Sequence, residues 1–532
     1  MTRILLTGPF KPFAVDNIYS RKESIPELFH NQLTHFQGIY SPRMDFPTHG
    51  LHLIAANVPE DVTVLEWPTL ERFEKEVKKG YDYVGIGSIA PNLQKVKKMT
   101  ETVRLLSPRT KIMIGGFCAM IPDLDKLLEA DYVCVGEGIS FVRELLGHSP
   151  EFDFVHPDIT PALIQVLGIH IRNYVPAIVT SLGCSRGCDF CCTTHFFGKK
   201  HITLMHTGRE IFNEMERLEG RFKSTAFNLT GDDNFLLDSR RALELHDCIV
   251  ESGKPYSYGV FASADLCKSF GPRKLAEMGI DSVWIGRESK FSSYAKTRGV
   301  DVKELIDELA DWGIWVILSS IILMDCHTED NIWEDIDDHI ACRPAFSQFA
   351  PLSPAPVTPL WDRMDSEGRI LRFIPIEEWH GFKQPWVIHP HFTLMEAEAL
   401  QRQAYEKDFL TLGPGIARMA HTVIRGYMNF KQTDSPPLLA RAREIEKHLW
   451  LYKAAMYDME LLADNPQVKE VIRELRKDME RMVGKLSVFE KAVAGGGFLA
   501  GSYRKLRNRL FSDVIQPRTR VFHYPANWTP SN

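Results

Sequence analysis

Short apolar runs alternate with amphipathic, helix-like stretches over the first 150 residues of the chain. Runs that are apolar on both faces and are interleaved with helices are typical of a parallel β-sheet covered on two sides, so we predict an α/β, Rossmann-like sheet in residues 1–150. Nearly every run ends in glycine or another small residue, and the ligand crevice of such sheets lies at the carboxyl ends of the strands. The predicted strands are ILLTG (4–8), VTVLEW (62–67), YVGIGSI (83–89), KIMIGG (111–116) and YVCVGEG (132–138).

A second alternating block occupies residues 173–365, after a linker at residues 151–172 that has little periodicity. Sequence with a helical pattern fills each gap between its apolar runs. Six β/α units at roughly regular spacing predict a partial (β/α)6 barrel. The working face of such a barrel is formed by the carboxyl ends of its strands. The predicted strands are PAIVTSLG (176–183), AFNLTG (226–231), SYGVFAS (257–263), SVWIGRES (282–289), WVILSSIILM (315–324) and FSQFAPL (346–352).

Residues 366–532 have the pattern of a mostly helical region, which we expect on the substrate side of the molecule. Apolar residues there recur in steps of three and four on either side of the sequence ADNP (463–466), which predicts a helical hairpin with one apolar seam on each arm. The seams are Ile445, Leu449, Tyr452, Met456 and Met459 on the first arm, and Val468, Ile472, Leu475, Met479, Met482 and Leu486 on the second.

The overall composition is ordinary for a soluble globular protein of 532 residues, with 44% apolar and 25% charged residues. The formal net charge of −6 gives no support to a nucleic-acid-binding function. The opening MTRILLTGPF does not have the pattern of a signal peptide, and no apolar run approaches the roughly 20 residues that a spanning helix needs. We therefore expect a cytoplasmic protein with reduced thiols, in which clustered cysteines indicate metal or redox chemistry.

Four of the ten cysteines lie within nine positions, directly after the first predicted strand of the barrel. Cys184, Cys188 and Cys191 form C-x3-C-x2-C, and three such thiolates can each bind one iron of a cubane cluster while the fourth iron stays open. A zinc site that uses His195 or Cys192 as a further ligand is the alternative. The dispersed cysteines, which we predict to be small buried apolar residues, are Cys118, Cys134, Cys248, Cys267, Cys326 and Cys342.

This cysteine motif resembles that of the radical SAM enzymes, and three further segments in the barrel strengthen the resemblance. GDDNF (231–235) lies where the family binds the SAM amino group, and IGRES (285–289) is similar to its ribose-binding element. FAPLSPAPVTP (349–359) is similar to its sixth-strand segment, although Val357 replaces a glycine. The resemblance implies a [4Fe-4S] cluster on the three cysteines. It also implies SAM contacts by Phe190, Gly231, Asp232, Asp233, Ser263, Glu288 and Ser289.

The first 150 residues resemble the cobalamin-binding domain that precedes the barrel in one large subfamily of these enzymes. GLHLIAANV (50–58) is similar to its helix after the long first loop, and small residues at the strand ends would let a nucleotide tail lie against the backbone. The sequence after the first strand is TGPFKPF rather than D-x-H-x-x-G, so we predict no histidine ligand to cobalt. A Rossmann-like domain without a corrinoid is the alternative. The implied cobalamin contacts are Pro9, Ser88, Gly115, Gly116, Gly136 and Glu137.

Together these resemblances imply an enzyme that cleaves SAM to a 5′-deoxyadenosyl radical and, with cobalamin, methylates an unactivated carbon of a small-molecule or lipid substrate. An electron donor such as flavodoxin or ferredoxin would serve the cluster. Two alternatives remain open at this point. One is a cyclisation or rearrangement that uses the same cofactors without methylation, and the other is a protein that binds SAM or a corrinoid without turnover.

Two features of the C-terminal region are candidates for contact with a substrate or a membrane. Three histidines (His380, His389 and His391) lie near two tryptophans (Trp379 and Trp386) and could line a substrate pocket, although structural hydrogen bonds would also explain them. The stretch GGGFLAGSYRKLRNRLF (495–511) is basic and aromatic and has no acidic residue. It could make a peripheral contact with a membrane surface or a lipid substrate, or it could be a solvated helix.

Overall fold

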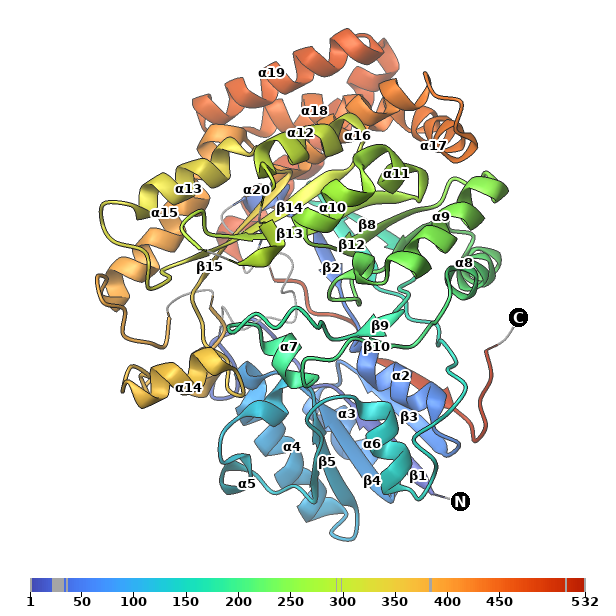
Figure 1. The fold of residues 1–532 in the computed structure, drawn as a ribbon, viewed down its shortest axis with the longest axis vertical. Coiled ribbons are helices and arrows are strands. Elements are labelled where there is room, and N and C mark those ends of the chain that lie inside the picture. Colours follow the sequence, from blue (N-terminus) through green and yellow to red (C-terminus); the bar gives the residue numbers. More distant parts are fainter. Residues whose placement is uncertain are drawn as a thin grey trace.

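The computed structural model describes residues 2–21, 33–34, 37–292, 294–297, 299–381, 385–511 and 514–530. An N-terminal sheet, a central curved sheet with helices around it, and a C-terminal set of helices follow one another along the molecule (Figure 1). The five strands predicted for residues 1–150 are all present and pair in parallel, with the order β3-β1-β4-β5-β6. They are β1 (Arg3–Thr7), β3 (Asp61–Glu66), β4 (Tyr83–Gly87), β5 (Lys111–Gly115) and β6 (Tyr132–Val133).

Both faces of this sheet are buried, which explains why its strands are continuous apolar runs. In β1, Ile4 and Leu6 belong to the core beneath α2 (His49–Asn57) and α6 (Gly138–Leu145). Leu5 points to the opposite core. That second core is covered by α3 (Leu70–Val77), α4 (Leu93–Leu106) and α5 (Leu124–Leu127).

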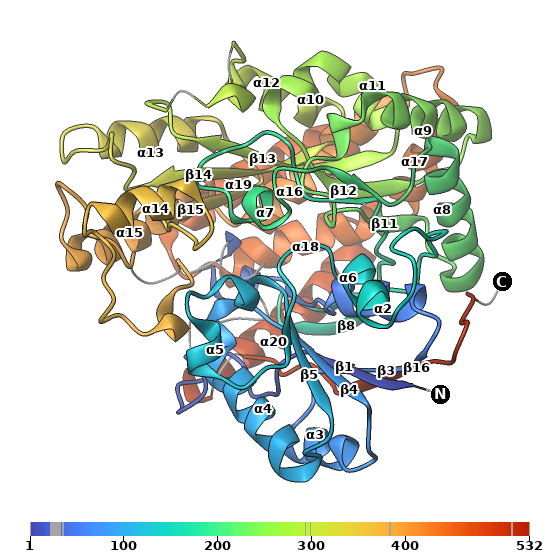
Figure 2. The same cartoon turned by 60° about the horizontal axis from the view of Figure 1, so that its bottom comes forward.

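The sheet has a sixth strand that the sequence pattern did not predict. β16 (Arg520–Tyr524) comes from the C-terminal end of the chain and pairs antiparallel with β3 (Figure 2). Its last residue, Tyr524, is buried, and its hydroxyl lies 2.8 Å from Nδ1 of His52 on α2. The C-terminal region is therefore mostly helical, as predicted, but its end completes the N-terminal sheet.

The central sheet contains five regular parallel strands, in chain order from β11 to β15. The predicted first strand at 176–183 is correct only for its opening residues, because residues 176–178 pair with β11 and the chain then turns away. Two of its later residues instead form β9 (Ser181–Leu182), antiparallel to β10 (Ile202–Thr203). The five strands are β11 (Ala226–Asn228), β12 (Ser257–Phe261), β13 (Ile280–Glu288), β14 (Trp315–Ile322) and β15 (Phe346–Pro351).

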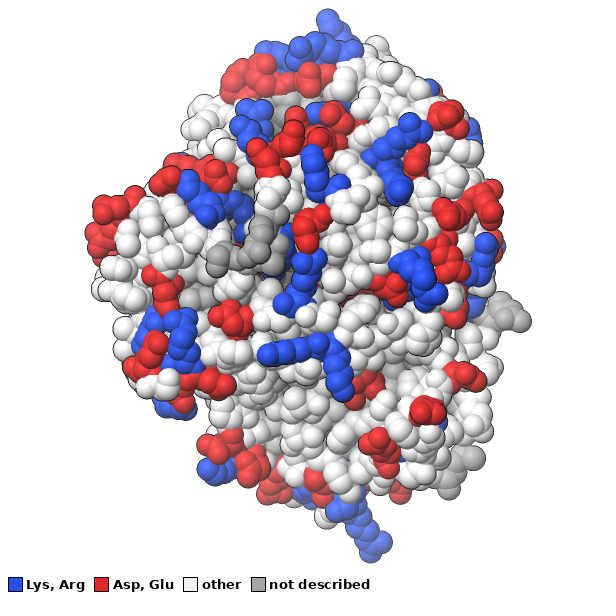
Figure 3. Space-filling view, in the orientation of Figure 1, with Lys and Arg blue, Asp and Glu red and all other residues white. Residues whose placement is uncertain are grey.

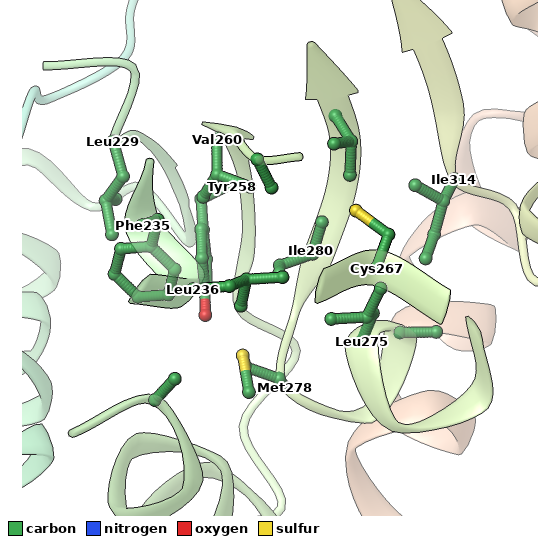
Figure 4. Close-up of a cluster of buried hydrophobic side chains, with 14 of the residues drawn as sticks. Leu229, Phe235, Leu236, Tyr258, Val260, Cys267, Leu275, Met278, Ile280 and Ile314 are labelled. Atoms are coloured by element: carbon green, nitrogen blue, oxygen red, sulfur yellow. The ribbon is translucent and has the colours of Figure 1, made fainter. Parts of the chain in front are cut away.

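Helices cover the outer face of the central sheet, and their apolar sides fill the space against the strands. Figure 4 shows part of this core, in which Tyr258 of β12 lies beside Phe235, while Cys267 and Leu275 belong to the same core on the side of Ile280 and Ile314. One dispersed cysteine contradicts our prediction of burial, because Cys326 lies in an exposed turn after β14. The helices are α8 (Gly208–Phe222), α9 (Ser239–Ser252), α10 (Ala264–Phe270), α11 (Pro272–Glu277), α12 (Val302–Asp311) and α13 (Ile332–Ala341).

The predicted helical hairpin is present as α18 (Leu449–Leu462) and α19 (Pro466–Val483). Met456 and Met459 of its first arm are buried in one core with Val468, Ile472 and Met479 of the second. Ile445 belongs to the preceding helix, because the chain bends at His448. The other C-terminal helices are α14 (Pro359–Ser366), α15 (Leu394–Leu412), α16 (Gly415–Phe430), α17 (Pro436–Lys447) and α20 (Val488–Leu510).

A small third sheet joins the first two parts of the molecule. It has the order β2-β7-β8 and is antiparallel, with β2 (Arg43–Asp45), β7 (Ala162–Val166) and β8 (Ile169–Tyr174). Much of the predicted linker is therefore β-structure. Within the described residues, none of the helices combines the length and the apolar character that crossing a bilayer requires. Basic and acidic side chains are interspersed over the face seen in Figure 3.

Candidate active site

A cavity of about 500 Å³ lies between the carboxyl ends of the N-terminal strands and the start of the central sheet. From the central side, its wall is formed by Val179, Leu182, Gly231 and two phenylalanines of the segment that follows the cysteines. That segment, α7 (Cys192–Phe196), lies between the two sheets in Figure 1. All six residues predicted to contact cobalamin line this cavity: Pro9, Ser88, Gly115, Gly116, Gly136 and Glu137.

The floor of the cavity is backbone at the ends of β4 and β5. Ser88 N–H donates to the Gly115 carbonyl (3.1 Å), and the Ser88 carbonyl accepts from Cys118 N–H (2.9 Å). Gly116 has a φ of +72°, and a Cβ there would lie 2.5 Å from the Ser88 carbonyl oxygen. Gly115 differs, because a Cβ on it would meet no atom closer than 4.0 Å. The two glycines therefore serve separate purposes: Gly116 permits close strand packing, and Gly115 leaves open space.

The loop after β6 brings the N-terminal sheet into contact with the cysteine-bearing segment. A Cβ on Gly136 would lie 3.5 Å from the carbonyl oxygen of Phe196, and the rings of Phe117 and Phe196 are 5.0 Å apart. Glu137 caps α6 by accepting from the N–H groups of Ile139 and Ser140. Its carboxylate thus holds the helix whose first turn forms one side of the cavity.

The cavity wall also contains a histidine that our sequence analysis did not select. His49 begins α2, and its Nε2 is buried without a hydrogen-bond partner in the part of the chain that the structure describes. Burial, with smaller contributions from the nearby His52 and His156, lowers the pKa of His49 to about 4. The ring is therefore neutral at pH 7. We predicted no histidine ligand to cobalt from the segment after β1; the structure shows that a histidine reaches the cavity wall from α2 instead.

The three motif cysteines lie together in the loop between β9 and α7. Cys184 is buried, and Cys188 and Cys191 are partly buried. Burial raises the pKa of the Cys184 and Cys188 thiols, and the negative charges of neighbouring motif thiolates raise it further. The charges of the three thiolates therefore influence one another, as is expected for ligands of one cluster.

The alternative ligands for a zinc site are used differently. The ring Nε2 of His195 lies 3.1 Å from the carbonyl oxygen of Cys188, and burial raises the pKa of the Cys192 thiol to about 12. No three His, Cys, Asp or Glu side chains among the described residues surround a single point as ligands of one metal ion would. A cubane cluster does not need that arrangement, because each thiolate binds a different iron.

Asp232 anchors the chain just before the cysteine loop. Its fully buried carboxylate accepts from the backbone N–H groups of Thr180 (2.9 Å) and Ser181 (2.8 Å) and from both of their hydroxyl groups. The buried guanidinium of Arg241 lies 3.2 Å from the same carboxylate and also donates to the Thr180 carbonyl (3.1 Å). These bonds explain why the predicted strand ends early, because its N–H groups bond a side chain instead of a neighbouring strand. Asp232 positions the loop and offers no exposed atom to a ligand.

Asp233 and Ser263 tie the cysteine loop to the next two strand ends. Asp233 accepts from Gly183 N–H (2.8 Å) at the start of the loop, and burial raises the pKa of Asp233 to about 6. Arg186, inside the loop, donates to the Ser263 hydroxyl (3.1 Å) and to Asp265 (2.8 Å). The loop is thus held at both sides by polar residues that follow β11 and β12.

Glu288 forms a buried ion pair with Lys296, a residue that our sequence analysis missed. Glu288 has a φ of +63° at an irregularity of β13, which turns its side chain away from the regular ladder. The Lys296 ammonium lies 5.3 Å from the ring centre of Phe190 and lowers the thiol pKa of Cys184 and Cys188. No sequence pattern pointed to Lys296, because it lies in a short turn far from the motif.

Ser289 belongs to a polar network behind this pair. Its hydroxyl lies 3.2 Å from Nε2 of His327, and that ring nitrogen lies 3.0 Å from Asp335. Asp335 also accepts from Arg287 (2.9 Å), and its pKa is held below its usual range by these partners. The side chain of Ser289 is fully engaged with the protein.

The histidines and tryptophans after β15 have structural partners. Trp379 and Trp386 stack with their rings 5.7 Å apart, and the Trp386 indole N–H donates to the Pro354 carbonyl (3.1 Å). His389 is buried and lies 3.1 Å from the Met324 carbonyl oxygen, and its Nδ1 accepts from His391 N–H (3.1 Å). These contacts favour the structural explanation of this group over a metal or catalytic role. Val357, which replaces a glycine of the family motif, has a φ of +69°.

The known proteins with a similar sequence include methyltransferases. No family model matches the chain. It is similar to an uncharacterized methyltransferase of Pyrococcus horikoshii, with 23% identity over 240 residues, 44% of this chain and 51% of that protein. It is also similar to the hopanoid C-2 methylase of Rhodopseudomonas palustris, with 22% identity over 281 residues, half of each protein. The bacteriochlorophyllide d C-12(1)-methyltransferase of Chlorobaculum tepidum shares 23% identity over 378 residues, 65% of this chain and 79% of that protein.

The solved structures that match the chain include a methyltransferase. The radical S-adenosylmethionine methyltransferase TsrM from Kitasatospora setae, determined with cobalamin and a [4Fe-4S] cluster, matches with a TM-score of 0.48 and 15% identity, covering 69% of this chain and 78% of that chain. The matched region spans about half of the length of the first two sequence relatives. The resemblance that the sequence motifs indicated is confirmed: the curated proteins to which this chain is similar are methyltransferases.

Proposed function

We propose that this chain is a radical SAM enzyme that uses cobalamin to methylate an unactivated carbon of a small-molecule or lipid substrate. One observation carries the proposal. The cavity that is lined by all six predicted cobalamin residues is also lined by the segment directly after the cysteine motif. Gly231, one of the predicted SAM contacts, lines the same cavity. This supports the proposal that the two cofactor sites open toward one space, as transfer of a group between them requires.

The residues fit the proposed groups. Cys184, Cys188 and Cys191 would hold a [4Fe-4S] cluster, and Gly115 leaves the open space that a corrinoid needs beside the strand ends. When bound, the cluster supplies the electron that cleaves SAM, and cobalamin supplies the methyl group. The largely apolar wall of Val179, Leu182 and the neighbouring phenylalanines would exclude water from the reacting carbon.

The polar residues around the cysteine loop have positioning roles in this proposal. Asp232 and Arg186 hold the loop at its two sides, so the thiolates keep their spacing. The Lys296 ammonium balances part of the negative charge of the thiolates and of Glu288. We assign SAM contacts to residues near the loop with accessible atoms, Phe190, Gly231 and Asp233, whereas Asp232 and Ser289 act through their neighbours.

The methyltransferase relatives support methylation over a rearrangement that uses the same cofactors. We further propose the domain division 1–150, 173–365 and 366–532 for cobalamin, SAM and substrate. An electron donor such as flavodoxin or ferredoxin would reduce the cluster, and the cytoplasm would keep the thiols reduced.

The absorption spectrum of protein purified without oxygen from cells supplied with cobalamin tests this proposal. The wild-type chain should show corrinoid bands beside a broad iron–sulfur shoulder. Gly115→Leu, which places a side chain in the cavity where a Cβ meets no atom closer than 4.0 Å, should lose the corrinoid bands and keep the shoulder. Gly220→Leu on the exposed side of α8 is the matched control and should keep both. A wild-type spectrum without corrinoid bands would contradict the proposal.

A further inference from the structure

One side of α20 carries an exposed apolar stripe, which is densest in the C-terminal half of the helix. From Leu499 to Leu510 its members recur every three or four residues, and the exposed fractions in the whole stripe range from 58% at Leu506 to 87% at Val488. Such an exposed stripe is unusual for the surface of a soluble protein, on which large apolar side chains are normally scattered. The stripe consists of Val488, Phe489, Leu499, Tyr503, Leu506 and Leu510, and Phe511 directly after the helix continues it.

The opposite side of α20 is firmly packed, so the orientation of the stripe is determined by contacts. Ala494, Gly501 and Arg504 are buried against the rest of the protein. A Cβ on Gly501 would lie 2.6 Å from Cδ1 of Leu462 at the end of α18, which shows how closely the two helices approach. A rotation of α20 that buried the stripe would place Arg504 in solvent and break this contact. The stripe is therefore a surface that the fold presents outward.

Within the part of the chain that the structure describes, the charges on α20 that have no opposite partner all have one sign. Between Glu490 and the end of α20 there is no acidic residue, and Glu490 itself is buried and paired with Lys453 (2.9 Å). Lys505 pairs with Asp464 (2.7 Å), and Arg504 is buried. The remaining cations on the helix have no acidic partner among the described residues, and they are Lys491, Arg507 and Arg509.

We propose that α20 docks this protein on a lipid bilayer that contains anionic headgroups, with the helix lying in the plane of the surface. An apolar stripe flanked by unpaired cations is the pattern by which amphipathic helices bind such interfaces, because the apolar side chains enter the acyl boundary and the cations meet the phosphates. A second copy of the chain fits less well, since a symmetric contact along the stripe would bring like charges together. Trp450, whose ring lies 6.2 Å from that of Phe489, extends the surface with a residue type favoured at bilayer interfaces.

Flotation of the full chain with lipid vesicles tests the proposal. The wild type should float with vesicles of phosphatidylcholine that contain roughly 30% phosphatidylglycerol, and much less with pure phosphatidylcholine. The double variant Leu499→Glu/Leu506→Glu should bind the anionic vesicles about tenfold more weakly or worse. Both positions are exposed, so folding should be unaffected. Leu105→Glu is the control, because Leu105 is an even more exposed leucine on α4, and it should bind as the wild type does.

The contribution of the cations to binding is tested by the variant Arg507→Glu/Arg509→Glu, which should remove the preference for anionic vesicles. The proposal is overturned if the wild type does not float with anionic vesicles at low salt, or if Leu105→Glu weakens binding as much as the stripe variant does. It is also overturned in favour of self-association if light scattering shows a dimer that Leu499→Glu/Leu506→Glu dissociates while vesicle binding is absent in both proteins. None of these readouts depends on the cofactors, so they are independent of the proposed enzymatic function.

Discussion

Asp232 accepts two hydrogen bonds from Ser181, one from its backbone N–H and one from its hydroxyl, each 2.8 Å long. The first residue follows β11, and the second lies three positions before the first cysteine of the motif. A buried carboxylate, which Arg241 balances, therefore anchors the segment that leads into the cysteine loop to the central sheet.

Asp232→Asn should destabilise the protein, because Arg241 is fully buried and would lose its counter-charge. Breaking a buried pair in this way costs about 3–5 kcal/mol, which a urea denaturation curve would measure. Asp247→Asn, at an exposed position on α9, should change the free energy of unfolding by less than about 0.5 kcal/mol. Equal stability of the Asp232 variant and the wild type would show that the carboxylate is not the anchor.

Gly116→Ala should weaken the junction between β4 and β5. A Cβ there would lie 2.5 Å from the Ser88 carbonyl oxygen, and the φ of +72° strains any side chain. We expect a loss of about 1–3 kcal/mol in the free energy of unfolding, measured by chemical denaturation. Gly220→Ala in α8, where a Cβ meets nothing within 4 Å, should leave stability the same or slightly higher. If Gly116→Ala left the free energy of unfolding unchanged, the ends of β4 and β5 could move apart without destabilising the protein.

Lys296→Met should raise the thiol pKa of Cys188 and Cys184 in the iron-free protein, because the ammonium lowers both. Alkylation by iodoacetamide at pH 7 should then be about three- to tenfold slower at these cysteines, as followed by mass spectrometry. Lys290→Met is the control, since Lys290 pairs with Glu334 at the surface. An unchanged alkylation rate would show that Lys296 does not influence the thiols of these cysteines.

The stability of the protein should fall as pH rises from about 4 to 7 through the ionisation of Asp458. This carboxyl is buried beneath α20, and burial alone raises its pKa to about 7. Its folded pKa lies above the unfolded value, so the neutral form contributes fully at low pH, and the contribution is lost as pH passes the folded pKa. Asp458→Asn should flatten the dependence by about 4 kcal/mol in denaturation curves between pH 4 and 8. Asp123→Asn removes an exposed carboxylate and should leave the pH dependence of stability unchanged.

The N-terminal strands could be predicted because each lies between two helical layers and is apolar on both sides, a property that the sequence of one strand carries by itself. The first barrel strand could be predicted only in part. The residues after Ile178 continue the predicted strand in the sequence, but the N–H groups of Thr180 and Ser181 bond Asp232, some 50 positions later. β16 could not be predicted, since a short strand is recognised by its partner, and β3 lies more than 450 positions away.

The candidate site likewise contains residues that the sequence could reveal and residues that it could not. The cysteines and the small residues at the strand ends could be found, because spacing and residue type alone set them apart. Lys296 and His49 could not, since their relevance depends on which side chains surround them in the folded chain. Tertiary contacts also changed the roles predicted for Asp232 and Ser289, because their polar atoms hydrogen-bond other residues of the protein.

SAM cleavage by the anaerobically reconstituted protein tests the central claim most directly. With a strong reductant, the wild type should carry about four irons per chain and release 5′-deoxyadenosine. The triple variant Cys184→Ala/Cys188→Ala/Cys191→Ala should do neither, while Cys248→Ala, which removes a buried thiol outside the motif, should do both. A wild type that holds a single zinc ion, or a triple variant that still cleaves SAM, would contradict the account.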